Sequence, residues 1–292
     1  MLKGLIPVLL TPMKKNFILD EDGMFNLINY LIDSKVGGLW ALGSASEEIN
    51  IGMKQKVQAA RLIGEINNQR IPVIMGTGAV SYSDHMNFLD QVSDIKFDGI
   101  HVLPFDLKMG KSRTINLYEK IADESPYPVW MYHNPKRGRA FELDTIKHLS
   151  EHSNIGGIKI GGYNLSELTR CFMLKNDNFD VVAAGSGQVY QMMCMGAEAH
   201  TTSEGSILPK LFQKIIDLYN EGKHEASWSL QQKWILLNAQ IPRTDNGEHS
   251  AEEKYMLSLL NICEEWVNPN YVTLDKVTKE TVLRIFNEMQ KL

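Results

Sequence analysis

The chain has 292 residues, of which 43% are hydrophobic and 22% are charged, the composition of a globular protein with a sizeable core. Its formal net charge of -5 argues against a nucleic-acid-binding surface, and no apolar run is long enough to span a membrane. We therefore expect neither a nucleic acid nor a membrane as its partner.

The chain is expected to work in the cytoplasm. Its first residues lead directly into a strand-like segment, without the apolar core and cleavage site of a signal peptide. The three cysteines, Cys171, Cys194 and Cys263, lie far apart and lack the spacing of metal ligands. Such a sparse, odd set suits a reducing compartment, where thiols serve as small core residues.

Short apolar segments alternate with segments of helical periodicity along most of the chain. The segment 20–34, for example, repeats Met24, Leu27 and Leu31 at helical spacing, and the segment 83–95 is predicted to be a helix that starts on a serine cap. Strands are predicted over 4–12, 39–43, 72–76, 99–104, 129–132, 154–162, 181–184 and 199–203. Helices are predicted over 20–34, 54–67, 83–95, 113–122, 143–150, 165–174, 188–195 and 210–220.

Eight strand–helix units at intervals of roughly thirty residues predict an α/β fold, a (β/α)8 TIM barrel with a C-terminal helical extension. A doubly wound open sheet is the alternative, but no glycine-rich nucleotide turn follows the first strand. The catalytic barrel is expected over residues 1–222 and a helical region over 223–292. That region has predicted helices near 225–239, 251–260 and 274–289 and an expected mobile linker over 243–250.

One short stretch carries the strongest sign of chemistry. Lys159 lies near the end of the sixth predicted strand, between Ile158 and Ile160 and within an apolar core bounded by glycines. Burial disfavours the ammonium form and lowers the pKa of a lysine toward working pH, as attack on a carbonyl requires. The alternative is a lysine that ends the strand and extends to water.

Other functional groups are expected at the same end of the barrel, where the carboxyl ends of the strands meet. Ser44 follows the second predicted strand, Tyr132 ends the fifth, and Arg137 lies on the loop after it. A neutral lysine, a phenol that shuttles protons and a cation for a carboxylate together suit Schiff-base chemistry on a 2-keto acid. The alternatives are a tyrosine that only packs and an arginine that is solvated.

In the order and spacing of its motifs, the chain resembles the dihydrodipicolinate synthase/N-acetylneuraminate lyase family of pyruvate-Schiff-base lyases. The likeness runs from the first predicted strand to the helical tail. It rests on the Gly-Ile-Lys that ends at Lys159, the Tyr-x-x-Pro that begins at Tyr132, the glycine and glutamate of the turn at Gly43 and Glu47, and the Gly-Thr-Gly turn over 76–78.

The resemblance implies a Schiff-base-forming lyase or aldolase that acts on pyruvate or another 2-keto acid through Lys159. Tyr132 would relay protons with its hydroxyl near that of Ser44, and the N–H groups of Ser44 and Ala45 would hold the keto-acid carboxylate. Arg137 would meet a carboxylate of the second substrate, with an aldehyde as co-substrate or product. Neither a metal nor an organic cofactor is implied, and a homo-oligomer, a dimer or a tetramer, is expected.

Two further residues at strand ends, Gly185 and Thr202, are expected to contribute to substrate binding. The turn Gly185-Ser186-Gly187 either binds an anion near the seventh and eighth strands or is a plain tight turn.

The chain departs from the family pattern in three places. The turn after the second strand reads Gly-Ser-Ala-Ser-Glu, so a hydroxyl of the family motif is lost at Ala45 and its glycine becomes Ser46. The tyrosine that a neighbouring subunit normally adds to the relay is replaced by Asp106. The acidic pair with which the lyases bind sugar hydroxyls appears as Gly187 and Gln188, which counts against a sialic acid as substrate.

Two rival functions are compatible with these residues. One is a 2-keto-acid dehydratase or decarboxylase that uses the same imine, and the other is a non-catalytic barrel that binds a ligand after losing the relay. Trapping with borohydride separates an enzyme that forms an imine from a protein that only binds.

Overall fold

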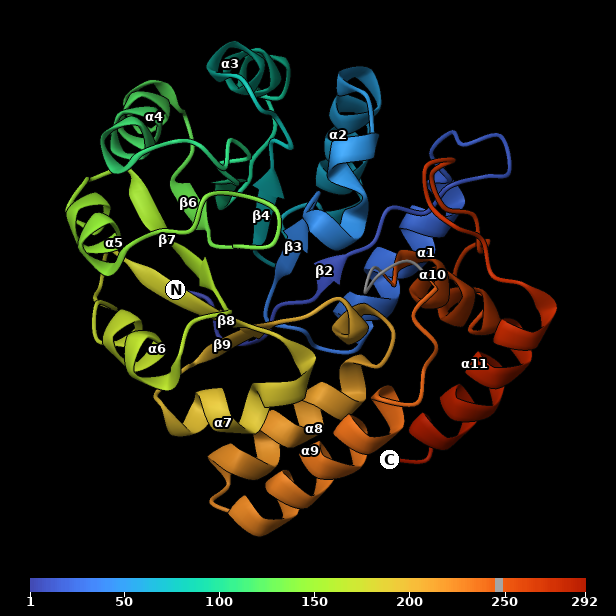
Figure 1. Ribbon diagram of the computed structural model, residues 1–292. Helices are drawn as coiled ribbons and strands as arrows, with labels where there is room; N and C mark the ends of the chain where they lie inside the picture. Colours follow the sequence, from blue (N-terminus) through green and yellow to red (C-terminus); the bar gives the residue numbers. More distant parts are fainter. Residues whose placement is uncertain (245–248) are drawn as a thin grey trace.

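The computed structural model describes residues 1–244 and 249–292, and its centre is one curled parallel sheet (Figure 1). Within these residues, nine strands follow one another in the order β1-β9-β8-β7-β6-β5-β4-β3-β2. Their bounds are β1 Gly4–Leu5, β2 Val8–Leu9, β3 Leu39–Ala41, β4 Val73–Gly76, β5 Gly99–Val102, β6 Val129–Tyr132, β7 Ile155–Ile160, β8 Asp180–Ala184 and β9 Ala199–Thr201. Because every neighbouring pair is parallel, the carboxyl ends of the strands meet at one end of the sheet, which we call its mouth.

The first predicted strand, over 4–12, is wrong in extent, because the structure divides it into β1 and β2 around Pro7. Proline has no N–H to donate and interrupts a strand ladder. Ile6 N–H donates to His200 O at 2.8 Å, whereas Pro7 O accepts from the N–H of Trp40 at 2.9 Å. This first segment therefore hydrogen-bonds toward β9 on one side and toward β3 on the other.

Helices surround the sheet and connect its strands (Figure 1). They are α1 Glu21–Asp33, α2 Met53–Asn67, α3 Tyr82–Gln91, α4 Lys111–Glu124, α5 Leu143–Ser150, α6 Leu165–Phe172, α7 Val189–Cys194 and α8 Pro209–Asn220. Short 3-10 helices follow β3 and β9 and precede α7, at η1 Ser44–Ser46, η2 Glu48–Asn50, η3 Ser186–Gln188 and η4 Glu204–Ser206. None of the described helices combines the length and the apolar character that a membrane crossing requires.

The start of α3 differs from the prediction. The helix begins at Tyr82, so its cap is Ser81 rather than Ser83, and it ends at Gln91 instead of continuing to residue 95. Ser81 Oγ accepts the N–H of Asp84 at 3.1 Å, which satisfies one of the unpaired donors of the first turn. Two serines close together offered equivalent caps, so residue type alone could not decide between them.

Apolar side chains fill both faces of the sheet. The larger core lies between the sheet and the helices and includes the stripe of α1 that contains Met24, Leu27 and Leu31. A smaller cluster on the other face contains Trp40 and Trp130, whose rings meet edge to face with centroids 6.1 Å apart. The interior of the curled sheet is therefore packed with side chains.

The C-terminal helices α9 His224–Asn238, α10 Ser250–Leu259 and α11 Lys276–Met289 cover one side of the molecule (Figure 1). Glu47, from the turn after β3, reaches this region: its Oε1 lies 2.5 Å from Lys254 Nζ on α10, and both side chains are fully buried. The linker expected over 243–250 falls partly on 245–248, outside the described residues, and its last residue, Ser250, is already helical.

Candidate active site

Lys159 lies next to the carboxyl end of β7, and its side chain is only 5% exposed. Its neighbours Ile158 and Ile160 belong to the core between sheet and helices, so strand alternation turns Lys159 to the interior face. There its Nζ lies 4.5 Å from the ring centroid of Tyr132 and 5.0 Å from that of Trp40. Burial lowers the pKa of Lys159, with the Tyr132 phenol acting in the opposite direction. The lysine is therefore buried as predicted and does not extend to water.

Tyr132 ends β6, where the register of the sheet pairs it with Lys159 on β7. Its hydroxyl donates to Ser44 Oγ at 3.1 Å, so the expected closeness of the two hydroxyls is observed. Asn134 Nδ2 donates to both oxygens at 3.4 Å and fixes their relative position. Asn134 was not among the predicted site residues, although its place inside the Tyr-x-x-Pro motif was a usable signal.

The turn that carries Ser44 is held in place by Ser46, the serine that replaces a glycine of the family motif. Ser46 Oγ accepts the N–H of Gly43 at 3.1 Å and donates to Leu9 O at 2.6 Å, which ties the turn to β2. The N–H groups of Ser44 and Ala45 open η1, so they have no partner within that helix. They are therefore available donors at the mouth of the sheet.

Glu48 is a functional candidate that was not predicted. Its side chain is 2% exposed, and its Oε1 accepts a hydrogen bond from Ser44 Oγ at 3.4 Å. Burial raises the pKa of Glu48, while the charges of Arg137 and Lys56 act in the opposite direction. The sequence shows two adjacent glutamates, Glu47 and Glu48, at this turn. Which of the two side chains points toward Ser44 depends on the backbone of Glu47, which turns the chain with a left-handed φ of 62°.

Arg137 lies half-buried on the loop after β6. Its backbone N–H donates to Asn134 O at 3.0 Å, which closes a tight turn directly after the Tyr132 strand. Its positive charge favours the ionised form of Glu48, so the guanidinium contributes to the electrostatics around Ser44. The structure thus brings Arg137 to the same end of the sheet as the predicted lysine and tyrosine.

Thr202 and Ser186, the residue after Gly185, contact another carboxylate, that of Glu204. Thr202 Oγ1 donates to Glu204, and Ser186 Oγ donates to it at 2.8 Å. Gly185 has a φ of 115°, which favours glycine, and its O lies 2.8 Å from His200 Nε2. Because a carboxylate takes the Ser186 hydroxyl, this geometry favours a tight turn over an anion site.

Asp106 lies on the loop after β5, and its side chain is 39% exposed. Its Oδ2 lies 3.1 Å from a guanidinium nitrogen of Arg113, and its Oδ1 accepts the N–H of Lys108 at 2.9 Å. Within this chain it is a solvated loop carboxylate.

One trio among the described residues has ligand-type atoms within 4.8 Å of one another: Glu204, His249 and Glu253. Hydroxyls already donate to both carboxylates, from Ser203 Oγ to Glu253 at 2.6 Å and from Ser186 Oγ to Glu204 at 2.8 Å. Burial raises the pKa of Glu253 to about 7, so this carboxyl group can hold a proton and be neutral beside Glu204 without a cation. Hydrogen bonding therefore accounts for this trio.

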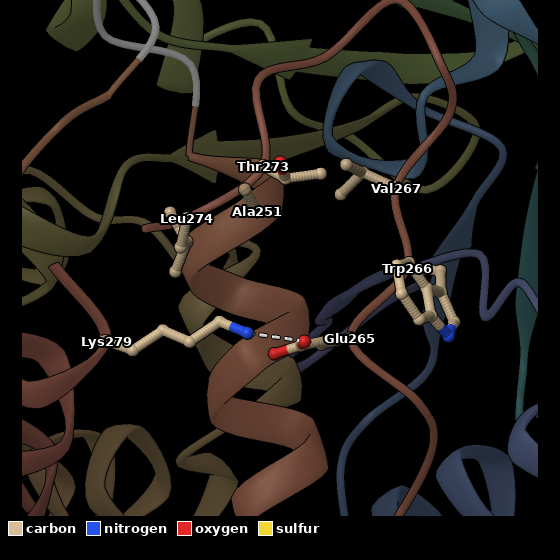
Figure 2. A pocket seen from close by; sticks show the side chains of 7 residues that line it. All are labelled: Ala251, Glu265, Trp266, Val267, Thr273, Leu274 and Lys279. Atoms are coloured by element: carbon tan, nitrogen blue, oxygen red, sulfur yellow. Dashed lines mark hydrogen bonds and ion pairs between the residues drawn. The ribbon is translucent and has the colours of Figure 1, made fainter. Parts of the chain in front are cut away.

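A pocket of about 190 Å³ in the C-terminal region is separate from these residues (Figure 2). Its lining consists of Ala251, Glu265, Trp266, Val267, Thr273, Leu274 and Lys279. Figure 2 shows that its two charged residues, Lys279 and Glu265, point toward each other, and they pair at 2.5 Å. The pocket therefore offers no nucleophile or proton donor comparable with those at the mouth of the sheet.

Comparison with known proteins reveals a likeness along the whole chain. Residues 1–287 match the model of the dihydrodipicolinate synthetase family. The 4-hydroxy-tetrahydrodipicolinate synthase of Methanococcus maripaludis is 27% identical over 239 residues, 81% of this chain and 82% of the relative.

Solved structures show the same fold. A prophage protein of the dihydrodipicolinic acid synthase family from E. coli K12, in complex with pyruvate, is 23% identical with a TM-score of 0.91, over 99% of this chain and 98% of its own. A dihydrodipicolinate synthase from Thermotoga maritima has a TM-score of 0.89 at 21% identity and covers 100% of both chains.

Proposed function

The chain belongs to the dihydrodipicolinate synthetase family, whose members are lyases, and from this premise we propose that Lys159 forms a Schiff base with pyruvate or another 2-keto acid. The observation that carries the proposal is a lysine buried at a strand end, with its Nζ 4.5 Å from the ring centroid of Tyr132. Burial favours the neutral amine, the form that attacks a carbonyl.

The reaction begins when the Lys159 amine attacks the keto carbon. A C–N bond forms, and the keto oxygen leaves as water after receiving one proton from the amine and one through Tyr132. The protonated imine draws electrons from the neighbouring carbon, so a C–H or C–C bond there can break and leave an enamine. Because the imine is itself the electron sink, the proposed reaction uses no metal or organic cofactor.

The other predicted residues are assigned to substrate binding. The keto-acid carboxylate is proposed to bind the N–H groups of Ser44 and Ala45, which open η1. Arg137 is proposed to meet the aldehyde partner, whether that partner is co-substrate or product. Gly185 and Thr202 are proposed to border the substrate from the ends of β8 and β9.

The wider assignments rest on the same framework. We infer that the curled sheet closes as a (β/α)8 barrel over residues 1–222, because its first segment pairs with both β9 and β3. Residues 223–292 form the proposed helical region, and the assembly is proposed to be a homo-oligomer. The free thiols of all three cysteines suit the proposed cytoplasmic location.

Borohydride trapping tests the function. The protein is incubated with pyruvate, reduced and mapped by peptide mass spectrometry, and we expect one irreversible adduct on Lys159. Lys159→Met should abolish it, whereas Lys120→Met, at an exposed position, should leave it unchanged. If no short 2-keto acid of a panel leaves an adduct on Lys159, the Schiff-base proposal is wrong.

A further inference from the structure

Glu48 is a buried carboxylate with few hydrogen bonds, an arrangement that a purely structural role does not require. It opens η2 with a side chain 2% exposed, and its Oε1 has a single long hydrogen bond, 3.4 Å from Ser44 Oγ. Its Oε2 is buried and has no hydrogen-bond partner within the described part of the chain. An unpaired buried carboxylate oxygen costs free energy, so a native protein that keeps one calls for a functional explanation.

A series of contacts connects Glu48 to the amine of Lys159. Glu48 Oε1 lies 3.4 Å from Ser44 Oγ, which lies 3.1 Å from the Tyr132 hydroxyl. The ring of Tyr132 is in turn beside Lys159 Nζ, at 4.5 Å from its centroid. Asn134 Nδ2 donates to the two central hydroxyls at 3.4 Å. Every group in this series belongs to one chain.

Cations from three elements face Glu48: Lys56 from α2, Arg137 from the loop after β6, and Lys159 from β7. Lys56 and Glu48 both approach Gly78, where an added Cβ would lie 3.0 Å from Lys56 Nζ and 3.3 Å from Glu48 Cβ. Burial raises the pKa of Glu48, with Arg137 and Lys56 acting in the opposite direction. Glu48 can therefore exchange a proton closer to neutral pH than an ordinary glutamate does.

We propose that Glu48 ends a proton relay to the Lys159 amine that is complete within one subunit. The hydroxyls of Ser44 and Tyr132 connect its two ends. The proposal rests on the Schiff-base function and deepens it. In the family pattern a neighbouring subunit adds a tyrosine to the relay, and here Asp106 stands at that position on an exposed loop. Glu48, from the same chain, would exchange the proton at the end of the relay in place of that tyrosine.

Protons balance along this relay. In the free enzyme, Glu48 and Lys159 share one proton. When the C–N bond forms, the keto oxygen takes one proton from the amine and one through Tyr132 and Ser44, and it leaves as water. Glu48 is then a carboxylate opposite a cationic imine. When a methyl C–H bond of bound pyruvate breaks, its electron pair forms the enamine double bond and its proton returns to Glu48.

Exchange of the pyruvate methyl protons for deuterium, followed by NMR, tests this relay without a second substrate. For the wild type we expect a rate that depends on pH as a bell-shaped curve, because the Glu48–Lys159 pair must hold one proton. Glu48→Gln keeps the shape but cannot ionise. Its rate should be lower by roughly 10- to 100-fold at the optimum and should rise steadily with pH, since only the amine remains to be deprotonated.

Two further variants sharpen the test. Lys56→Met removes a charge that lowers the pKa of Glu48, so the optimum should move to higher pH. Asp106→Asn should leave the exchange rate unchanged. A loss in Asp106→Asn equal to that in Glu48→Gln would overturn the proposal.

Different experimental results would reject the proposed relay and the proposed Schiff-base function. If Glu48→Gln stays within about threefold of the wild type at every pH while borohydride still labels Lys159, the relay is wrong and the Schiff base stands. If the wild type itself is never labelled, both are wrong. Should circular dichroism show that Glu48→Gln is unfolded, the Lys56→Met profile decides, and an unmoved optimum would reject the relay.

Discussion

Glu47 and Lys254 form an ion pair in which both side chains are fully buried, with Oε1 and Nζ 2.5 Å apart. Both charges have additional partners, because Lys254 Nζ donates to Trp266 O at 2.9 Å and Asn268 N–H donates to Glu47 Oε2 at 2.6 Å. Such bonds offset the free-energy cost of removing two charges from water. Since Glu47 directly precedes Glu48, the C-terminal helices hold the turn on which the active site depends.

Lys254→Met should therefore lower the free energy of unfolding by about 3–5 kcal/mol, because it leaves Glu47 buried without its cation. Urea titration measures this loss. The control is Lys276→Met, which removes a pair 3.9 Å long whose lysine side chain is 90% exposed, and it should change stability by less than about 1 kcal/mol. A loss in Lys254→Met no greater than in this control would contradict the role given to the ion pair.

Tyr132→Phe should leave the fold intact and reduce turnover by roughly 10²-fold or more, the usual effect of removing a positioned acid or base. Steady-state kinetics on the true substrate measures it. Tyr127→Phe is the matched control, because that buried hydroxyl donates to Val92 O and Ile95 O and should affect stability rather than turnover. Turnover of Tyr132→Phe within about threefold of the wild type would reduce Tyr132 to a packing residue.

Lys159→Met should make the protein more stable while it abolishes activity. Burial lowers the pKa of Lys159 in the folded state, so the unfolded chain binds its proton more tightly. The resulting penalty is largest at low pH and disappears as pH rises through the ordinary lysine pKa. We expect a gain of about 0.5–2 kcal/mol at neutral pH that narrows toward pH 10. Thermal unfolding across this pH range measures the difference in stability between the variant and the wild type. A variant less stable than the wild type would contradict the prediction.

Synthase activity with pyruvate and aspartate semialdehyde should be low. Asp106 is partly exposed and pairs with Arg113 at 3.1 Å, and its carboxylate cannot replace the phenol that the family relay uses. The charge of Arg137 is also partly offset by Glu48, which weakens its attraction for the carboxylate of this aldehyde. Assay of the purified protein with both substrates should give a specificity constant well below about 10⁴ M⁻¹s⁻¹, and a higher value would identify a true synthase.

The lysine and the tyrosine could be placed from the sequence because apolar runs bounded by turn residues define the strand ends, and parallel strands bring those ends together. Glu48 could not be placed from the sequence, because the direction of its side chain depends on the left-handed backbone of Glu47, which no local sequence pattern reveals. The contacts of Thr202 with Glu204 likewise depend on tertiary packing. The division of the first strand at Pro7 was foreseeable, because the missing N–H is a property of the residue itself.

The pairing of β1 with β9 has a consequence for how the protein is made. Gly4 and Leu5 leave the ribosome before the other strands of the sheet, whereas their strand partners, Ala199 and His200, follow only after every other strand. Until then the growing sheet keeps two unpaired edges, which are sites of association with other chains. Contacts so distant in sequence also slow folding. A ribosome-bound chain arrested before β9 should therefore need chaperone protection, whereas one arrested after α8 has emerged can pair both edges itself.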